Sequence, residues 1–178
     1  MEDLVKNNTN LVNQELLDAF AKQLSDEFYE IAKLGEAAVR EKIKSVQDYI
    51  QDLIDKGLAQ EVDFETVHRF APNIYLREVH IPKDQLVVGK IHRYEHLNFI
   101  SKGSVTVLTK DGAEHYVAPV TMTSSAGTQR LLYTHEDTVW SVIHPNKDNE
   151  RDLAKIEETH IAKNYDEFPI LEEKIIGE

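Results

Sequence analysis

The segment Gly89–Gly103, GKIHRYEHLNFISKG, decides the fold of this chain. It carries two histidines four residues apart, His92 and His96, next to an apolar run that ends at a glycine. On both sides of it, short β-branched and aromatic runs alternate with Gly, Pro, Asp or Ser at intervals of about 8–12 residues. This rhythm is typical of antiparallel sandwiches and barrels. We therefore predict a mainly β, antiparallel barrel over residues 61–147.

The clearest strand precedes this segment, at Asn73–Ile81, NIYLREVHI. Successive side chains of a strand point to opposite faces, so one face is predicted to carry Tyr75, Arg77, Val79 and Ile81. Trp140, in the later run DTVWSVIH, is interpreted as a core residue.

Composition limits the classes of function. The 178 residues suit one compact domain with an appendage, and the net charge of −12 argues against binding to nucleic acid or to an anionic membrane. The polar start MEDLVKNNTN and the lack of a long apolar run predict neither a secretory signal nor a membrane span. Without cysteine, a disulfide or a thiolate metal site is excluded. These features fit a protein of the cytoplasm, including that of a host cell, or of a virion.

Residues 1–60 are predicted to form an N-terminal helical region. Apolar residues recur there at steps of three and four, at Leu17, Phe20, Ala21, Leu24, Phe28 and Ile31, and after Gly35 at Val39, Ile43, Val46, Ile50 and Leu53. The second set has the a/d spacing of a coiled coil. Two interpretations stay open. The helices form a hairpin that packs on itself or on the sheet, or they pair between protomers and make a homo-oligomer.

The last part of the chain, residues 148–178, is predicted to form an acidic surface helix followed by a tail. The helix is expected within NERDLAKIEETHIAKNY, with Leu153, Ile156 and Ile161 as its apolar contacts.

The barrel segment resembles the cupin superfamily, whose fold is a double-stranded β-helix or jelly roll. The first cupin motif contains HxH, then a glutamate, and a glycine seven residues after the glutamate. Anchoring that glycine on Gly103 puts His96 at the glutamate, His92 at the second histidine and Lys90 at the first. The second motif, PxGxxH, is matched by residues 125–130, SAGTQR, with Arg130 at the final histidine.

The departures from the cupin pattern concern the metal site. Cupin metals sit among three imidazoles and a carboxylate, whereas arginine has no lone pair and lysine must first lose its proton. If the resemblance holds, Lys90, His92, His96 and Arg130 share a pocket, with Tyr133 as a further lining residue. This set favours a small anionic or polar ligand. Two alternatives remain: a vestigial barrel in which these side chains satisfy one another, and a weakly bound divalent metal on His92 and His96.

Two classes of function follow from the resemblance. The first is a non-catalytic cupin-like binding or virion-associated module of an oligomeric protein; the helical start, HRYEHLNFISKG and DTVWSVIHPN also resemble small uncharacterised proteins of tailed bacteriophages. The second is a metal-dependent cupin enzyme, such as a dioxygenase, an isomerase or a sugar-modifying enzyme, using His92 and His96. The missing carboxylate and histidines favour the first class, but the sequence assigns no catalytic residue and does not decide whether the protein is an enzyme.

Overall fold

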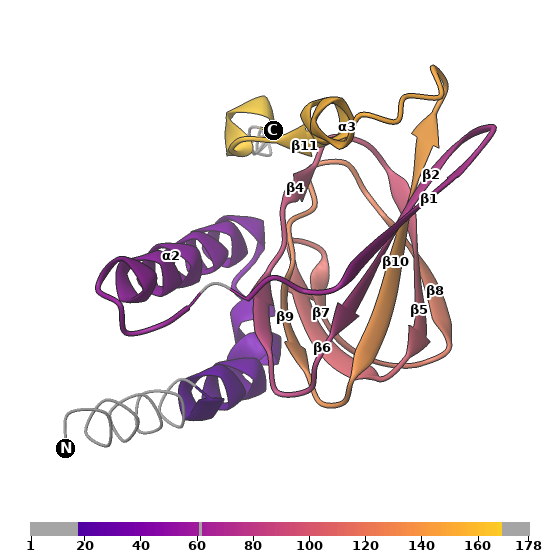
Figure 1. Ribbon diagram of the computed structural model, residues 1–178. Helices are drawn as coiled ribbons and strands as arrows, with labels where there is room; N and C mark the ends of the chain where they lie inside the picture. Colours follow the sequence, from indigo (N-terminus) through magenta and orange to yellow (C-terminus); the bar gives the residue numbers. More distant parts are fainter. Residues whose placement is uncertain (1–17, 61, 169–178) are drawn as a thin grey trace, which may run out of the picture.

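The computed structural model describes residues 18–60 and 62–168, and its centre is a barrel of two antiparallel sheets (Figure 1). The first sheet has the strand order β1-β2-β10-β5-β8 and the second β3-β9-β6-β7. The first contains β1 (Thr66–Ala71), β2 (Asn73–Ile81), β10 (Thr138–Asn146), β5 (His96–Lys102) and β8 (Val120–Ser124). The second contains β3 (Leu86–Val88), β9 (Leu131–Thr134), β6 (Ser104–Thr109) and β7 (Gly112–Val117). The predicted mainly β fold is confirmed.

Gly103 makes the sharp turn from β5 into β6. Its φ of +94° is one that residues with a side chain rarely adopt. A Cβ atom there would lie 2.5 Å from Thr138 Oγ1 and 2.6 Å from the Asp137 carbonyl oxygen. The glycine that anchors the motif is therefore required by both backbone conformation and space.

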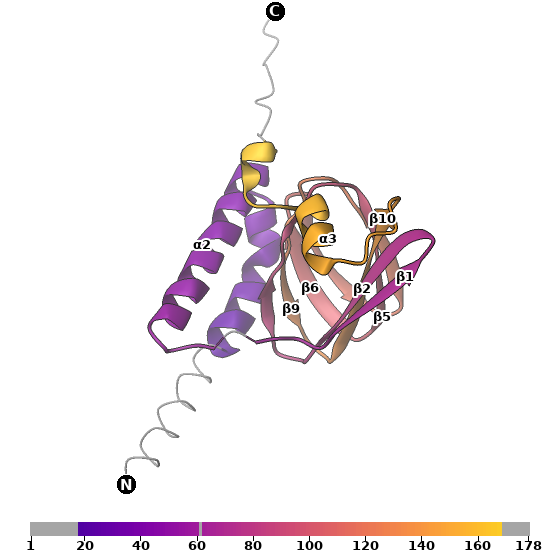
Figure 2. The ribbon, with the colours of Figure 1, turned by 45° about the horizontal axis from the view of Figure 1, so that its top comes forward.

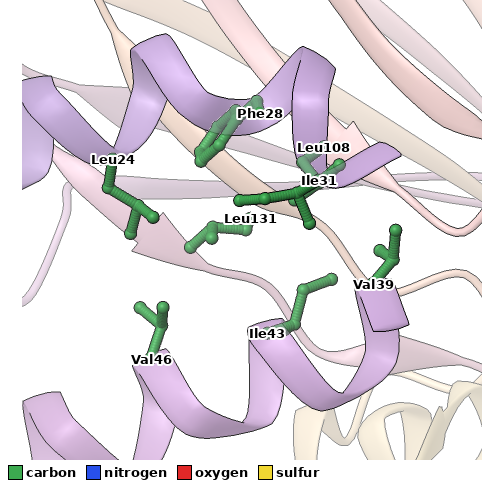
Figure 3. Packing of buried hydrophobic residues seen from close by; sticks show 8 residues of the cluster. All are labelled: Leu24, Phe28, Ile31, Val39, Ile43, Val46, Leu108 and Leu131. Atoms are coloured by element: carbon green, nitrogen blue, oxygen red, sulfur yellow. The ribbon is translucent and has the colours of Figure 1, made fainter. Parts of the chain in front are cut away.

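Two helices precede the barrel, as predicted: residues 18–32, and α2 (Glu36–Asp55). They lie against the outer face of the second sheet (Figure 2). The apolar side chains of the two helices and of that sheet meet in one cluster, shown in Figure 3: Leu24, Phe28, Ile31, Val39, Ile43, Val46, Leu108 and Leu131. Three of the five residues with coiled-coil spacing in α2, Val39, Ile43 and Val46, are thus buried within the chain. This favours the hairpin interpretation over pairing between protomers.

The interior of the barrel holds a second apolar cluster: Ile81, Ile100, Val105, Val107, Leu132 and Trp140. Trp140 is only 4% exposed, so it is a core residue as interpreted. The side chains of β9 alternate, because Leu131 packs with the helices and Leu132 packs inside the barrel.

The C-terminal part closes one end of the barrel. The predicted helix is α3 (Leu153–His160), which begins at the N-cap Asp152 and lies across the end of the barrel (Figure 2). After it, β11 (Ile161–Ala162) pairs with β4 (Ile91–His92), and the short η1 (Tyr165–Glu167) follows. Within the described ranges, no helix is long and apolar enough to cross a membrane.

Candidate functional site

Four histidines meet where α3 covers the barrel. They come from β4, β5, β10 and α3, and they are His92, His96, His144 and His160. The ring centroids of His92 and His96 are 4.1 Å apart, those of His92 and His144 are 5.2 Å apart, and those of His144 and His160 are 4.5 Å apart. His144 follows Trp140 by four residues on β10, so both side chains lie on the inward face of the strand. One stack of imidazoles therefore runs from the barrel interior to its cover.

Arg130 lies at the inner end of this stack and is 6% exposed. Its Nη2 lies 3.3 Å from His96 Nε2 and also donates to Ser124 Oγ, while its Cζ lies 5.4 Å from the centroid of the Trp140 ring. A guanidinium can only donate, so His96 Nε2 is the acceptor. The proton of His96 is then on Nδ1, which donates to the Tyr94 carbonyl at 2.9 Å.

Backbone pairing brings the two motif segments together. The Arg130 carbonyl accepts from Gly89 N at 2.8 Å, and the Thr128 carbonyl accepts from His92 N at 3.1 Å. These bonds continue the pairing of β3 with β9 beyond the end of both strands. They fix the position of Arg130 opposite the histidine segment.

A buried amide, that of Asn98, binds two side chains that neighbour the guanidinium, Ser124 and Trp140. Asn98 Nδ2 donates to Ser124 Oγ at 3.0 Å, and Asn98 Oδ1 accepts from Trp140 Nε1 at 3.0 Å. The polar atoms around Trp140 and Ser124 are thereby satisfied.

The imidazoles are uncharged at neutral pH. Burial, reinforced by neighbouring cations, lowers the pKa of His92 to about 2 and that of His144 to about 3. Burial also lowers the pKa of His96 to about 4, although its bond to the Tyr94 carbonyl acts in the opposite direction. The pKa of Arg130 is lowered by burial to about 10, so this group stays protonated. The site therefore contains one buried positive charge among neutral rings.

This charge has no anionic partner among residues 18–60 and 62–168. No carboxylate of those residues lies within 4.0 Å of the guanidinium, and its Nε and Nη1 make no hydrogen bond to them. Nearby, the buried Nδ1 atoms of His92, His144 and His160 have no hydrogen-bond partner in the described part of the chain. Buried polar groups in native proteins are nearly always paired, so the site has donors and acceptors to offer a ligand.

The structure brings three of the five predicted ligand-binding residues together: His92, His96 and Arg130. Lys90 is not in the pocket; it is exposed on the surface, where its Nζ binds Glu157 Oε1 at 2.6 Å. Tyr133 points away from the barrel interior because it has the same phase on β9 as Leu131, and its hydroxyl donates to Asp84 Oδ1 at 3.1 Å.

Two members of the site, His144 and His160, were missed by the sequence analysis. Alternate residues of a strand share a face, so the sequence did indicate that His144 lies on the same face as the core residue Trp140. His160 enters only because α3 folds back over the barrel, and no local pattern indicates it.

The described residues do not fit a metal at the cupin position. Both nitrogens of His96 are engaged, and the guanidinium of Arg130 stands where a ligating histidine is expected. In the part of the chain that the structure describes, no group of three or more His, Asp or Glu side chains is arranged to hold a metal ion.

No family model and no curated protein matches the sequence. Among solved structures, the chain is similar to a cupin-2 domain protein from Shewanella frigidimarina (12% identity, 52% of this chain and 91% of that chain, TM-score 0.40). It is also similar to an RmlC-like cupin with a double-stranded β-helix fold from Methanocaldococcus jannaschii (11%, 51% and 89%, TM-score 0.39). A third is KdgF from Halomonas sp. (14%, 53% and 90%, TM-score 0.40). The resemblance to phage proteins stays a prediction from the sequence.

Proposed function

We propose that the protein is a non-catalytic binding module whose barrel interior holds a small anion, recognised by Arg130. One observation supports this most directly: a guanidinium that is 6% exposed has no carboxylate within 4.0 Å among the described residues. A buried charge without a partner is expensive in free energy, whereas pairing it with an anion offsets that cost. The unpaired charge thus lowers stability in the free protein and becomes favourable in the complex.

The neutral imidazoles suit the same kind of ligand. A neutral imidazole carries one N–H donor and one acceptor nitrogen. The Nδ1 atoms of His92 and His144 have no hydrogen-bond partner among residues 18–60 and 62–168. Anionic oxygens near Arg130 can accept hydrogen bonds from such donors without adding a second positive charge. This arrangement supports recognition of a carboxylate or phosphate better than capture of a divalent cation, which the guanidinium repels.

The metal-dependent alternative, with His92 and His96 as ligands, finds no support in the geometry because His96 has no free nitrogen. The expected role in a virion rests on the sequence resemblance alone and stays a prediction.

Calorimetric titration of the protein with phosphate, sulfate and small carboxylates tests the proposal. We expect wild-type protein to bind at least one of them, and Arg130→Gln to weaken that binding by the equivalent of about 2–5 kcal/mol, the cost of removing one partner of a buried charge pair. Arg69→Gln is the matched control, because Arg69 is an exposed arginine that pairs with Glu78 at 3.5 Å. Wild-type protein that binds none of these anions, or an Arg130→Gln variant that binds as tightly, would overturn the proposal.

Stability gives a second readout on the same residue. In buffer without small anions, Arg130→Met should melt no lower than wild type, because replacing an uncompensated buried charge by an apolar side chain is often neutral or stabilising. Adding the bound anion should raise the melting temperature of wild type only. A variant that melts far lower in both buffers would show that Arg130 is needed for packing and contradict its role as the anion partner.

A further inference from the structure

A second arginine, Arg77, stands on the barrel-facing side of the first sheet. It lies on β2 between Tyr75 and Val79, in the phase of the strand that faces the barrel interior. Across the sheet it pairs with Val142 of β10, and the next inward pair along these strands joins Tyr75 to His144. The rings of Tyr75 and His144 are stacked with centroids 6.3 Å apart. Arg77 is therefore one inward position away from the histidine stack.

Arg77 is exposed, while its neighbour Tyr75 on the same face is 4% exposed. We therefore assign Arg77 to the solvent-accessible rim of the interior. No carboxylate among the described residues pairs with it, although Arg40, Arg69 and Arg93 each pair with a glutamate. The adjacent Glu78 points to the other face of the sheet, where it binds Arg69. Arg77 is thus left without the kind of partner that those three arginines have.

The charges of Arg77 and Arg130 act on the same rings. Each of the two guanidinium groups contributes to lowering the pKa of His92 and of His144, after the larger effect of burial. The rings near the two charges are neutral and flat: the imidazoles of His92 and His144 stack on each other, and the phenol of Tyr75 stacks on His144. One charge is buried and the other is at the rim, and neither is compensated within the described residues.

We propose that the ligand of the barrel is a small dicarboxylate, with one carboxylate on Arg130 in the interior, the other on Arg77 at the rim, and an uncharged body against the rings between them. This inference rests on the proposed function and specifies the ligand. A guanidinium matches a carboxylate in geometry and charge, and two of them set apart select a molecule with an acid at each end. Arg77 is the specificity-determining residue, because a monocarboxylate needs only Arg130.

Pairs of acids that differ by one carboxylate test the inference: succinate against butyrate, glutarate against valerate, and phthalate against benzoate. By calorimetry at constant ionic strength, we expect wild type to bind at least one dicarboxylate about tenfold or more tightly than its partner, the effect of one further charged hydrogen bond. Arg77→Gln should remove this preference and leave monocarboxylate binding within about twofold. Arg69→Gln removes an arginine from the opposite face of the same sheet. It should change neither the preference for dicarboxylates nor the affinity for monocarboxylates.

The outcomes separate the two proposals. If wild type binds carboxylates through Arg130 but shows no preference for dicarboxylates, or keeps its preference in Arg77→Gln, the dicarboxylate inference is wrong and the anion-binding function stands. If wild type binds phosphate or sulfate through Arg130 but no carboxylate, the dicarboxylate inference alone is wrong. If wild type binds none of these anions, or if Arg130→Gln binds as well as wild type, both fail. Because Arg77 is exposed, its variant should keep the melting temperature of wild type, which excludes misfolding as the cause of a lost preference.

Discussion

At the scale of single residues, the buried histidines make the stability of the protein depend on pH. The pKa values of His92, His96 and His144 are lowered from 6.5 to about 2, 4 and 3. Between pH 6.5 and these values the unfolded chain binds protons that the folded chain does not. The free energy of unfolding therefore falls as the pH falls through this window, by up to about 1.4 kcal/mol per pH unit for each histidine.

Urea denaturation at about pH 7 and about pH 5 measures this effect. We expect wild type to lose several kcal/mol on acidification, and His144→Gln to lose less, because one protonation site of the unfolded state is gone. Equal losses in the two proteins would contradict a contribution from His144.

The predicted and observed sites differ for reasons visible at individual residues. His92, His96 and Arg130 were predicted correctly as neighbours because the turn at Gly103 and the backbone bonds at Gly89 and His92 fix the motif segments in space. The prediction that Lys90 lies in the pocket was wrong because Lys90 precedes β4, which begins at Ile91. The rule that alternate residues of a strand share a face therefore does not apply to it. The sequence could not show that Tyr133 follows the outward phase of β9, since Leu131 and Leu132 are both apolar and both buried.

At the scale of elements, the turn between β5 and β6 requires glycine at position 103 for both conformation and space. Gly103→Ala is expected to destabilise the protein by more than the roughly 1–3 kcal/mol that an unfavourable backbone conformation alone costs, because its Cβ would also collide with Thr138 and Asp137. Gly35→Ala is the control, since Gly35 has a φ of +88° but no atom within 4 Å of the added Cβ. Chemical denaturation of both variants measures the difference. Equal losses would show that the contact at Thr138 has no energetic weight.

Long elements were predicted better than short ones. The strand Asn73–Ile81 has the predicted bounds, because nine alternating residues give a clear pattern. The two-residue strands β4 and β11 are too short to leave such a pattern, and they pair with each other across about 70 residues of sequence. The apolar residues of α2 were recognised as one face of a helix, but their spacing did not show what that face packs against. A helix that packs on a sheet and a helix that packs on another protomer both need apolar residues at these steps.

At the scale of the whole molecule, the predicted homo-oligomer needs a surface other than the apolar stripe of α2, which is buried within the chain. Among the described residues, Leu97 and Ile74 are 53% and 45% exposed, and both lie on strands of the first sheet, whose outer face the described helices leave uncovered (Figures 1 and 2). Contiguous exposed apolar side chains often mark a protein interface. We expect light scattering to give the mass of a dimer, and Leu97→Lys to shift it towards the monomer. A monomer mass for wild type at micromolar concentration would contradict the prediction.

Trp140 is the sole tryptophan of the chain, and it is in contact with the group to which the proposed function assigns recognition. Its indole is 4% exposed, is held by Asn98 and lies 5.4 Å from the Arg130 guanidinium. The tryptophan emission of the protein thus originates from the barrel interior alone. In the native state, this emission should be shielded from aqueous quenchers such as iodide. Its intensity should change when an anion binds the Arg130 guanidinium beside the ring. Trp140 is therefore an intrinsic fluorescent probe of the proposed anion-binding site.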